Sequence, residues 1–396
     1  MALTSAEIKQ ELGKLRIALV HDYLVQDGGA ERVLGAFQRI FPQAKTHVIV
    51  HNPKRTHPDF KDKEIITSFL NKWPLAKRYY QWYLPLLPIA VEHLDLSNFD
   101  LILTSSSSFA KGVIAPAGSK HVCYLHTPTR FLWEHRIGYL ADLPQPKIIR
   151  KALPWLLHRL RIWDKMAADR PDFLLTNSET SRQRIKRHYG RDADVIYPPV
   201  DVDRIPLSRH PGDYWLAGGR LVAYKKFDLI VKAFAKLNMP LIVFGVGPEL
   251  DRLKRLAGRK TAFVGQVNDQ EKVKLYRHAV GFVNPQIEDF GITAIEAMAA
   301  GRPVIAFGQG GAAETVIPGK TGVFIEAQSW EDIGDAVIRY RLGAYQPEAI
   351  RKHAEQFSYA AFEDKLLKHL ARYLKLEDES DHEEDFATEV YGSYLD

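Results

Sequence analysis

The chain has 396 residues, of which 46% are hydrophobic and 26% are charged, and it has a single cysteine, Cys123. This length predicts two domains, and the composition is typical of a globular protein rather than a disordered one. One cysteine excludes an intramolecular disulfide framework and fits a reducing compartment, and no apolar run reaches the roughly 18 residues that a membrane span requires. We therefore expect a cytoplasmic protein.

The net charge of +6 is distributed unevenly along the chain. Residues 377–396 contain nine acidic residues and neither Lys nor Arg, so the body of the chain is more basic than the total indicates. A basic body implies an anionic partner such as nucleic acid, lipid head groups or a phosphorylated substrate. Nucleic acid is disfavoured, because the positive charge is dispersed and the sequence has no basic recognition helix or paired stacking motif.

In the first half of the chain, five short apolar runs without alternation predict strands that are buried on both faces of a parallel sheet. They lie at residues 16–20, 46–50, 101–104, 121–125 and 173–176. Amphipathic stretches between them predict helices, which makes βαβ units. Gly28 and Gly29 follow the first strand, but they lack the Lys-Ser/Thr pair of a Walker phosphate loop.

Two segments of the first half mix basic, aromatic and aliphatic side chains. They are KWPLAKRYYQWYLPLLPIAVEHL, which begins at Lys72, and KIIRKALPWLLHRLRIW, which begins at Lys147. Basic residues with Trp and Leu favour an anionic membrane surface, which predicts a protein that is peripheral on the inner face of the membrane. The alternative is that the apolar residues belong to the core and the cations are simply solvated.

The two domains are expected to join at Tyr197-Pro198-Pro199-Val200, because adjacent prolines hold an extended segment that cannot continue a helix. The first domain is predicted to cover residues 1–198 and the second residues 199–358. The last helix, at residues 359–375, is expected to pack back on the first domain. Residues 376–396 are predicted to form an acidic, disordered tail.

Six further apolar runs predict the strands of the second domain, at residues 214–217, 241–244, 261–264, 281–283, 303–306 and 322–325. The fold class is therefore α/β, with parallel, doubly wound sheets. Gly245 and Gly247 end the second of these strands, where close packing is needed. They lack the third spaced glycine and the downstream acid of a dinucleotide site.

Arg220 and Lys225 lie five residues apart, between the first strand of the second domain and a helix that starts near Phe227. This places both at the carboxyl edge of a parallel sheet, where open α/β sheets bind ligands. An Arg forks two phosphate oxygens and a Lys supplies a mobile point charge, so the pair could stabilise a diphosphate leaving group. The alternative is a solvated cationic loop.

Glu288 and Glu296 lie eight residues apart around a glycine-containing turn that opens into a helix. Glu288 is predicted in the loop and Glu296 about one turn inside the helix. The N–H groups of Phe290, Gly291 and Ile292 would lie at the positive end of the helix dipole and could bind an anion. Two carboxylates there can accept hydrogen bonds from hydroxyl groups, as a nucleotide sugar would require. The alternative is a helix cap and a solvated side chain.

No metal or other cofactor is expected. The sequence has no His, Cys, Asp and Glu cluster with zinc spacing. Asp192-Ala-Asp194 and Asp201-Val-Asp203 look like the metal-binding Asp-x-Asp of some glycosyltransferases. They flank the connection between the domains, however, so we interpret them as structural.

The chain resembles the family 4 retaining glycosyltransferases from Leu15 to about Phe362. Motifs that follow one another in the order of that family carry the resemblance, and they are VHDYLVQDGGAERVL, DLILTSSSSFAKGV, CYLHTPTRFLW, DFLLTNSETSRQRIKRHYG, VIYPPVD, GGRLVAYKKFDLIVKAF, FGVGPELDRLK, FVGQVNDQEKVKLY, NPQIEDFGITAIEAMAAGRPVIAFGQGGAAETV and GKTGVFI. This resemblance implies the GT-B fold, in which two Rossmann-like domains face each other across a cleft.

The resemblance also implies roles for the residues that match the motifs of the family. Arg220 and Lys225 would hold the donor diphosphate, and Glu296 would accept hydrogen bonds from the ribose. Glu288 would bind hydroxyls of the transferred sugar beside the amides of Phe290, Gly291 and Ile292. Gly28 and Gly29 would let the backbone approach the donor phosphates or the acceptor. His126, at the end of the strand HVCYLH, would contact the sugar as an orienting and electrostatic group. A lone histidine at a strand end is otherwise more often structural.

The implied reaction moves a hexose from a nucleotide diphosphate sugar to an acceptor hydroxyl with retention and without a metal. HTPTRFLW, SETSRQRIKRHYG, YPPVD and GRLVAYKKFDL resemble bacterial mannosyltransferases that use GDP-mannose to build surface polysaccharides. The expected acceptor is a glycan or a polyprenyl-diphosphate-linked sugar. Alternatives are a UDP-sugar donor, a nucleotide-sugar epimerase of the same fold, and a non-catalytic sugar-nucleotide-binding protein.

Overall fold

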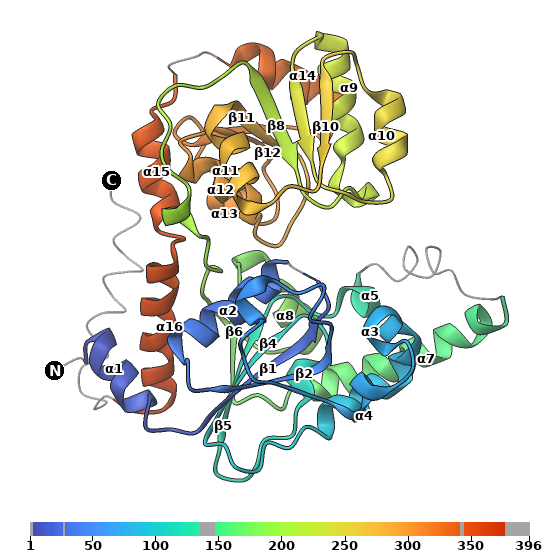
Figure 1. The fold of residues 1–396 in the computed structure, drawn as a ribbon, viewed down its shortest axis with the longest axis vertical. Coiled ribbons are helices and arrows are strands. Elements are labelled where there is room, and N and C mark those ends of the chain that lie inside the picture. Colours follow the sequence, from blue (N-terminus) through green and yellow to red (C-terminus); the bar gives the residue numbers. More distant parts are fainter. Residues whose placement is uncertain (1–2, 27, 135–146, 341–343, 377–396) are drawn as a thin grey trace. The chain divides into compact units, whose positions relative to one another are not determined.

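The computed structural model describes residues 3–26, 28–134, 147–340 and 344–376. The chain folds into two units, and many of their elements are labelled in Figure 1. The N-terminal unit comprises Met1–Thr176, Arg182–Ile196 and Phe362–Asp396, and the C-terminal unit comprises Asn177–Ser181 and Tyr197–Ala361. The division after Ile196 falls beside the two adjacent prolines. The acidic tail at 377–396 lies outside the described residues, so its disorder stays a prediction.

The sheet of the N-terminal unit has the strand order β3-β2-β1-β4-β5-β6-β7, and every pair is parallel. The strands are β1 (Ile17–Leu24), β2 (Lys45–His51), β3 (Ile65–Thr67), β4 (Leu101–Ser106), β5 (Lys120–Leu125), β6 (Phe173–Thr176) and β7 (Asp194–Val195). The five predicted strands are present. The prediction of about five strands omits β3 and β7, because three and two residues are too few to show a hydrophobic period.

Helices and short 3-10 turns connect these strands. The α-helices that lie wholly or mainly in the N-terminal unit are α1 (Ser5–Leu12), α2 (Gly29–Ile40), α3 (Ala76–Tyr79), α4 (Leu87–Glu92), α5 (Arg130–Trp133), α7 (Lys147–Ala167), α8 (Glu179–Tyr189) and α16 (Tyr359–Tyr373). The 3-10 helices are Pro58–Phe60, Phe69–Lys72, Tyr80–Leu86 and Ala110–Gly112.

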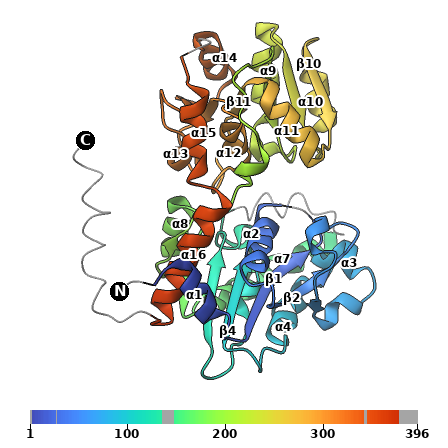
Figure 2. The same cartoon turned by 60° about the vertical axis from the view of Figure 1, so that its left-hand side comes forward.

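Helix α16 packs on the N-terminal unit although it lies at the far end of the sequence. The ring of Phe362 stacks on Phe37 with centroids 6.1 Å apart and meets Tyr124 edge-on at 6.0 Å. Lys9 on α1 forms an ion pair with Glu363 at 2.6 Å, and α1 and α16 lie side by side in Figure 2. Aromatic packing on the sheet strand β5 and the helix α2 therefore ties the last helix to the first unit.

The C-terminal unit contains the second parallel sheet, with the strand order β10-β9-β8-β11-β12-β13. The strands are β8 (Tyr214–Gly218), β9 (Leu241–Phe244), β10 (Thr261–Gly265), β11 (Ala279–Asn284), β12 (Val304–Phe307) and β13 (Gly322–Ile325). The helices are α9 (Phe227–Leu237), α10 (Leu250–Leu256), α11 (Asp269–His278), α12 (Ile292–Ala299), α13 (Ala312–Thr315), α14 (Trp330–Arg339) and α15 (Pro347–Glu355), with 3-10 helices at Val202–Arg204 and Ala223–Lys225.

The central strands of the second sheet are buried on both faces, which explains why they are unbroken apolar runs. Trp215 and Ala217 of β8 belong to one core cluster, together with residues of α9 and α14. Leu216, between them, belongs to the other cluster, together with residues of α12 and α15. Successive side chains of a strand point to opposite faces, so the α/β, doubly wound architecture is confirmed.

Among the residues that the structure describes, no helix is both long enough and apolar enough to cross a bilayer.

Glycines allow the loops that follow β8 and β9 to touch each other. Gly245 has φ +109°, and a Cβ atom there would lie 1.8 Å from the carbonyl oxygen of Gly219. A Cβ atom on Gly247 would lie 2.2 Å from the carbonyl oxygen of Leu221. Backbone hydrogen bonds join the two loops, including one of 2.9 Å from Leu221 N–H to Val246 O. The prediction that Gly245 and Gly247 allow close packing is confirmed, and the contact supports the loop that carries Arg220.

We expect Gly245→Ala to lower the free energy of unfolding by roughly 3 kcal/mol or more, because backbone strain and a clash with backbone act together. The matched control is Gly319→Ala. Gly319 also has a positive φ, +76°, but no atom lies within 4 Å of its added Cβ, so strain of about 1 kcal/mol is expected. Urea unfolding followed by circular dichroism measures the free energy of unfolding of both variants. Equal losses in the two variants would contradict the close-contact argument.

Candidate functional site

The first part of the site is the loop between β8 and α9. Lys225 ends the short 3-10 helix there, and its Nζ lies 2.6 Å from Oε1 of Glu288. The two side chains are only 14% and 19% exposed. Arg220, earlier in the loop, is exposed, and none of the residues that the structure describes forms an ion pair with its guanidinium group. Of the two predicted cations, Lys225 is therefore neutralised by Glu288, and Arg220 is solvated as the alternative interpretation expects.

The second part is the start of α12, at the carboxyl end of β11. Gly291, the N-cap residue, has φ +94°, and no side chain caps the N–H groups of the helix start. A Cβ atom on Gly291 would lie 3.7 Å from Oε2 of Glu288 and from Nδ2 of Asn284. Glu288 therefore lies beside the backbone of the helix start that runs from Phe290 through Gly291 to Ile292. The alternative that a glutamate caps this helix is wrong.

Glu296 lies inside α12 as predicted, but it is buried and bonded to α11. Its Oε2 accepts a hydrogen bond of 2.8 Å from the Tyr276 hydroxyl, and its Oε1 accepts one of 2.9 Å from Lys272 Nζ. The alternative of a solvated side chain is therefore wrong. The role of Glu296 as an acceptor of hydrogen bonds from ribose hydroxyls stays a prediction. Lys272 and Tyr276 were missed, although their spacing of four places them on one face of a helix.

The positions of these charged groups determine which of them could bind an anion in the C-terminal unit. Lys225, Gly291 and Glu288 lie together, with Arg220 at the start of the same loop as Lys225. An incoming diphosphate must share Lys225 with Glu288, whereas the charge of Arg220 is uncompensated by any described residue. The side of Glu288 that faces Lys225 is occupied, so hydroxyl groups would bind to the carboxylate where it faces Gly291 and Asn284.

His126, in the N-terminal unit, directly follows β5 and is buried. Its Nε2 lies 2.9 Å from the Ser105 hydroxyl, and its ring meets Tyr124 edge-on at 5.1 Å. Burial, with a smaller contribution from His21, lowers the pKa of His126 to about 3. The imidazole is therefore neutral near neutral pH and can orient a ligand through hydrogen bonds, but it does not carry a positive charge.

Gly28 and Gly29 lie at the start of α2, where Gly28 is the N-cap residue and Gly29 begins the helix. The φ of Gly28 is −153°, an extended conformation open to any residue. A Cβ atom on Gly28 would lie 2.9 Å from Oε2 of the buried Glu31, so this glycine leaves room for a carboxylate of its own helix. A role of Gly28 and Gly29 towards the donor or acceptor stays a prediction.

Buried polar groups hold the loops around His126. The Asp22 carboxylate accepts four backbone hydrogen bonds of 2.6 to 2.9 Å from the consecutive N–H groups of residues 107–110. Lys111 follows them and forms a fully buried ion pair with Asp164 at 2.6 Å. Asp164 also accepts hydrogen bonds of 2.7 Å from Thr129 and Tyr189. Buried charges need such partners, so removing one of them would leave an uncompensated charge.

The carboxylates of the first Asp-x-Asp segment are paired with cations. Asp192 accepts hydrogen bonds of 2.7 and 2.9 Å from Arg182, which lowers the pKa of Asp192 to about 2. Asp194 is bonded to Arg372 and Tyr373 of α16. Among the described residues, no three His, Cys, Asp or Glu side chains come together in a way that could hold a metal ion. Asp192 and Asp194 thus have a structural role in the N-terminal unit.

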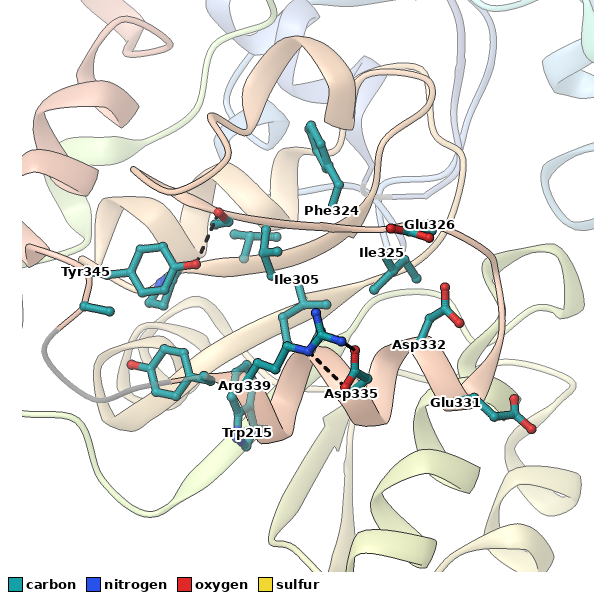
Figure 3. A pocket seen from close by; sticks show the side chains of 17 residues that line it. Trp215, Ile305, Phe324, Ile325, Glu326, Glu331, Asp332, Asp335, Arg339 and Tyr345 are labelled. Carbon is teal, nitrogen blue, oxygen red and sulfur yellow. Dashed lines mark hydrogen bonds and ion pairs between the residues drawn. The ribbon is translucent and has the colours of Figure 1, made fainter.

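A cavity of about 430 Å³ lies elsewhere in the C-terminal unit (Figure 3). Strands β12 and β13 and helix α14 line it, with Trp215 and Tyr345. Asp335 pairs with Arg339 at 2.8 Å, and the Tyr345 hydroxyl donates to Gly322 O at 3.3 Å. The lining contains none of the predicted site residues, so this cavity is separate from the Lys225–Glu288 pair.

Comparison with known families matches both halves of the chain. Residues 27–204 match "Glycosyltransferase Family 4", and residues 204–363 match "Glycosyl transferases group 1". The two matches adjoin and together include all the predicted site residues. The first part of the chain is therefore similar to the family 4 glycosyltransferases, and the second part to the group 1 glycosyl transferases.

Relatives and solved structures are consistent with this assignment. The D-inositol 3-phosphate glycosyltransferase of Mycolicibacterium smegmatis is 29% identical over 239 residues, which cover 53% of this chain and 55% of that protein. The enzyme of the same name from Mycobacterium tuberculosis strain CDC 1551 is 28% identical over 242 residues, covering 52% of this chain and 50% of that protein. The chain thus spans about half the length of the curated relatives it matches.

Two solved structures share the fold. HepE from Anabaena, solved with UDP and glucose, has a TM-score of 0.68 at 17% identity, covering 90% of this chain and 99% of that chain. Sucrose-phosphate synthase from Thermosynechococcus elongatus has a TM-score of 0.67 at 16% identity, covering 91% of this chain and 100% of that chain. Together with the two parallel-sheet units, these likenesses confirm the GT-B fold.

The buried histidines make stability depend on pH. Burial lowers the pKa of His21 and lowers the pKa of both His121 and His126 to about 3, against an ordinary value of 6.5. Between pH 6.5 and pH 3 the unfolded chain therefore binds protons that the folded chain does not. Stability is fully present above pH 6.5 and falls as the pH falls, by up to about 1.4 kcal/mol per pH unit for each histidine.

Urea unfolding at about pH 7 and pH 5.5, above the range in which most carboxylates titrate, measures this slope. His121→Gln removes one of the titrating groups, so its slope should be smaller than that of the unmodified chain. A free energy of unfolding that does not change between the two pH values would contradict the prediction.

Proposed function

We propose that the chain is a retaining glycosyltransferase, which moves a hexose from a nucleoside diphosphate sugar to an acceptor hydroxyl. The observation that carries the proposal is the Lys225–Glu288 ion pair of 2.6 Å at the uncapped start of α12. A cation that could bind a diphosphate, a carboxylate that could bind sugar hydroxyls and the N–H groups of a helix start lie near one another there, which supports the proposal. The similarity of the two halves of the chain to glycosyltransferase families supports the same reaction class.

The proposed mechanism is the one that the resemblance to retaining family 4 glycosyltransferases implies. The bond between the sugar and the diphosphate breaks, and Arg220 and Lys225 stabilise the negative charge that develops on the leaving phosphate. The acceptor hydroxyl attacks from the same face and gives its proton to that phosphate, so the configuration is retained and no metal is required. Glu288 orients the sugar, Glu296 binds the ribose and neutral His126 contributes a hydrogen bond.

GDP-mannose is the proposed donor, on the strength of the motifs shared with bacterial mannosyltransferases, and surface polysaccharide synthesis is the proposed context. A UDP-sugar is the second candidate, because HepE of the same fold was solved with UDP and glucose. The proposed acceptor is a glycan or a polyprenyl-diphosphate-linked sugar. An inositol phosphate is a further acceptor to test, given the names of the curated relatives.

A panel of nucleotide sugars tests the donor. We expect GDP-mannose to raise the melting temperature and to be turned over, because the ligand binds the folded chain but not the unfolded one. UDP-glucose and UDP are the comparison arms, and glycan, lipid-linked and inositol 3-phosphate acceptors are supplied in parallel. A shift with uridine nucleotides and none with guanosine nucleotides would contradict the GDP-mannose assignment, and interconversion without acceptor would indicate an epimerase.

Substitution of Lys225 tests the chemistry in the same assay. Lys225→Ala should lower kcat about 100-fold or more with a much smaller change in donor KM, because the charge is needed mainly in the transition state. Lys236→Ala, an exposed lysine at the end of α9, is the matched control and should retain full activity. Unchanged turnover in both Lys225→Ala and Arg220→Ala would end the assignment.

The N-terminal unit is proposed to bind an anionic membrane surface, from which a lipid-linked acceptor could be reached. The two basic and aromatic segments divide between core and surface. Leu84 and Leu157 are buried, whereas Trp73, Trp82 and Trp155 are 43%, 54% and 63% exposed. The alternative that the apolar residues belong to the core therefore applies to Leu84 and Leu157 but not to the three tryptophans. Exposed Trp beside Lys and Arg favours the interface of an anionic bilayer.

Vesicle co-sedimentation tests this surface. We expect binding to vesicles with anionic lipid and little binding to neutral ones. Trp155→Ser should weaken it about tenfold, which equals roughly 1.4 kcal/mol of lost apolar burial. Ile338→Ser is the control, because Ile338 on α14 is 66% exposed but lies in the C-terminal unit. Binding that is independent of anionic lipid, or equally weakened by both variants, would contradict the proposal.

A further inference from the structure

His21, Ser105 and His126 form a buried hydrogen-bonded chain across three neighbouring strands of the N-terminal unit. His21 on β1 lies in register with Ser105 on β4, and His126 follows β5, the next strand of the sheet. Nδ1 of His21 lies 2.9 Å from the Ser105 carbonyl oxygen and 3.1 Å from the Ser105 hydroxyl oxygen. That hydroxyl oxygen lies 2.9 Å from Nε2 of His126.

The carbonyl oxygen of Ser105 settles where the proton of His21 lies. A carbonyl oxygen can only accept a hydrogen bond, so Nδ1 of His21 carries the proton and donates it towards Ser105. If Nδ1 of His21 carried no proton, its lone pair would face the lone pairs of the Ser105 carbonyl oxygen at 2.9 Å, which is repulsive. The Ser105 hydroxyl is close to the same Nδ1–H group, so it accepts on that side and cannot donate its own proton there.

The hydroxyl proton of Ser105 then has His126 as its acceptor. Ser105 is fully buried, and the two histidines are the partners that the described residues offer to its hydroxyl group. If Nε2 of His126 carried a proton and donated it, the Ser105 proton would be left without an acceptor, which is unfavourable in a buried site. The arrangement that satisfies every group has Nε2 of His126 as an acceptor.

We propose that Ser105 is a positioning residue: oriented by His21, it donates its hydroxyl proton to Nε2 of His126 and holds His126 in the Nδ1–H tautomer. In this tautomer the Nδ1 group of His126 is a hydrogen-bond donor and not an acceptor. We take the group that accepts this hydrogen bond to be a hydroxyl of the transferred hexose, and this part of the inference rests on the proposed function.

The tautomer can be measured without any substrate. Histidine labelled with ¹⁵N is incorporated into the full chain, and long-range ¹H–¹⁵N spectra are recorded near neutral pH, with His126→Gln used to assign the resonance. We expect a protonated Nδ1 and a bare Nε2 for His126 in the unmodified chain. A protonated Nε2 would overturn the proposal whatever the enzymatic activity of the chain.

The variants Ser105→Ala and Ser105→Thr test the cause. Ser105→Ala should give a mixture of the His126 tautomers and lower kcat about tenfold, with donor KM changed less than about threefold. Ser105→Thr keeps the hydroxyl group and should restore both the tautomer and kcat. Unchanged tautomer and kcat in Ser105→Ala would overturn the positioning role.

Ser106→Ala is the matched control. Ser106 is the next residue of β4 and equally buried, and its hydroxyl accepts a hydrogen bond of 3.1 Å from the Lys111 N–H group. Ser106 bonds to His126 only through its backbone carbonyl among the described residues, and the alanine variant keeps that bond. It should destabilise the fold by a similar amount and leave the His126 tautomer unchanged. A changed tautomer in Ser106→Ala would show a general disturbance of the sheet and overturn the specific role of Ser105.

Discussion

The ion pair between Lys225 and Glu288 connects the two loops on which the proposed chemistry of the C-terminal unit depends. One loop follows β8 and carries Arg220, and the other leads from β11 into α12. Because both side chains are mostly buried, the pair is less screened than a surface ion pair and holds both groups before a ligand arrives. A diphosphate that binds Lys225 draws it towards a second anion, while Glu288 remains oriented for hydroxyl groups.

The two units supply different kinds of polar group. The C-terminal unit presents full charges, whose attraction to a leaving phosphate grows as its negative charge develops. The N-terminal unit presents neutral imidazoles, which burial keeps uncharged, and an aspartate whose charge is compensated by four backbone N–H groups. Neutral donors and acceptors suit the orientation of a sugar, because they discriminate hydroxyl positions without attracting the diphosphate.

Most strands were predicted correctly because both sheets are parallel and their central strands are covered on both faces. A strand buried on both faces needs apolar side chains at every position, which gives an unbroken apolar run in the sequence. The strands β3 and β7 were not predicted, because their formation depends on pairing with the neighbouring strand rather than on a pattern in their own few residues. The packing of α16 on the first unit was expected. The residues that secure it, such as Phe362 against Phe37, are separated by more than 300 positions and show no local pattern.

By itself, the sequence determined the α/β class and the position of Glu288 before a helix and Glu296 within it. These are consequences of local periodicity and helix boundaries, which neighbouring residues are sufficient to set. The tertiary structure decided which side chains pair: Lys225 with Glu288, Lys272 and Tyr276 with Glu296, and Ser105 with His21 and His126. Those contacts join different strands and helices, and their geometry exists only once the sheets bring the ends of distant segments together.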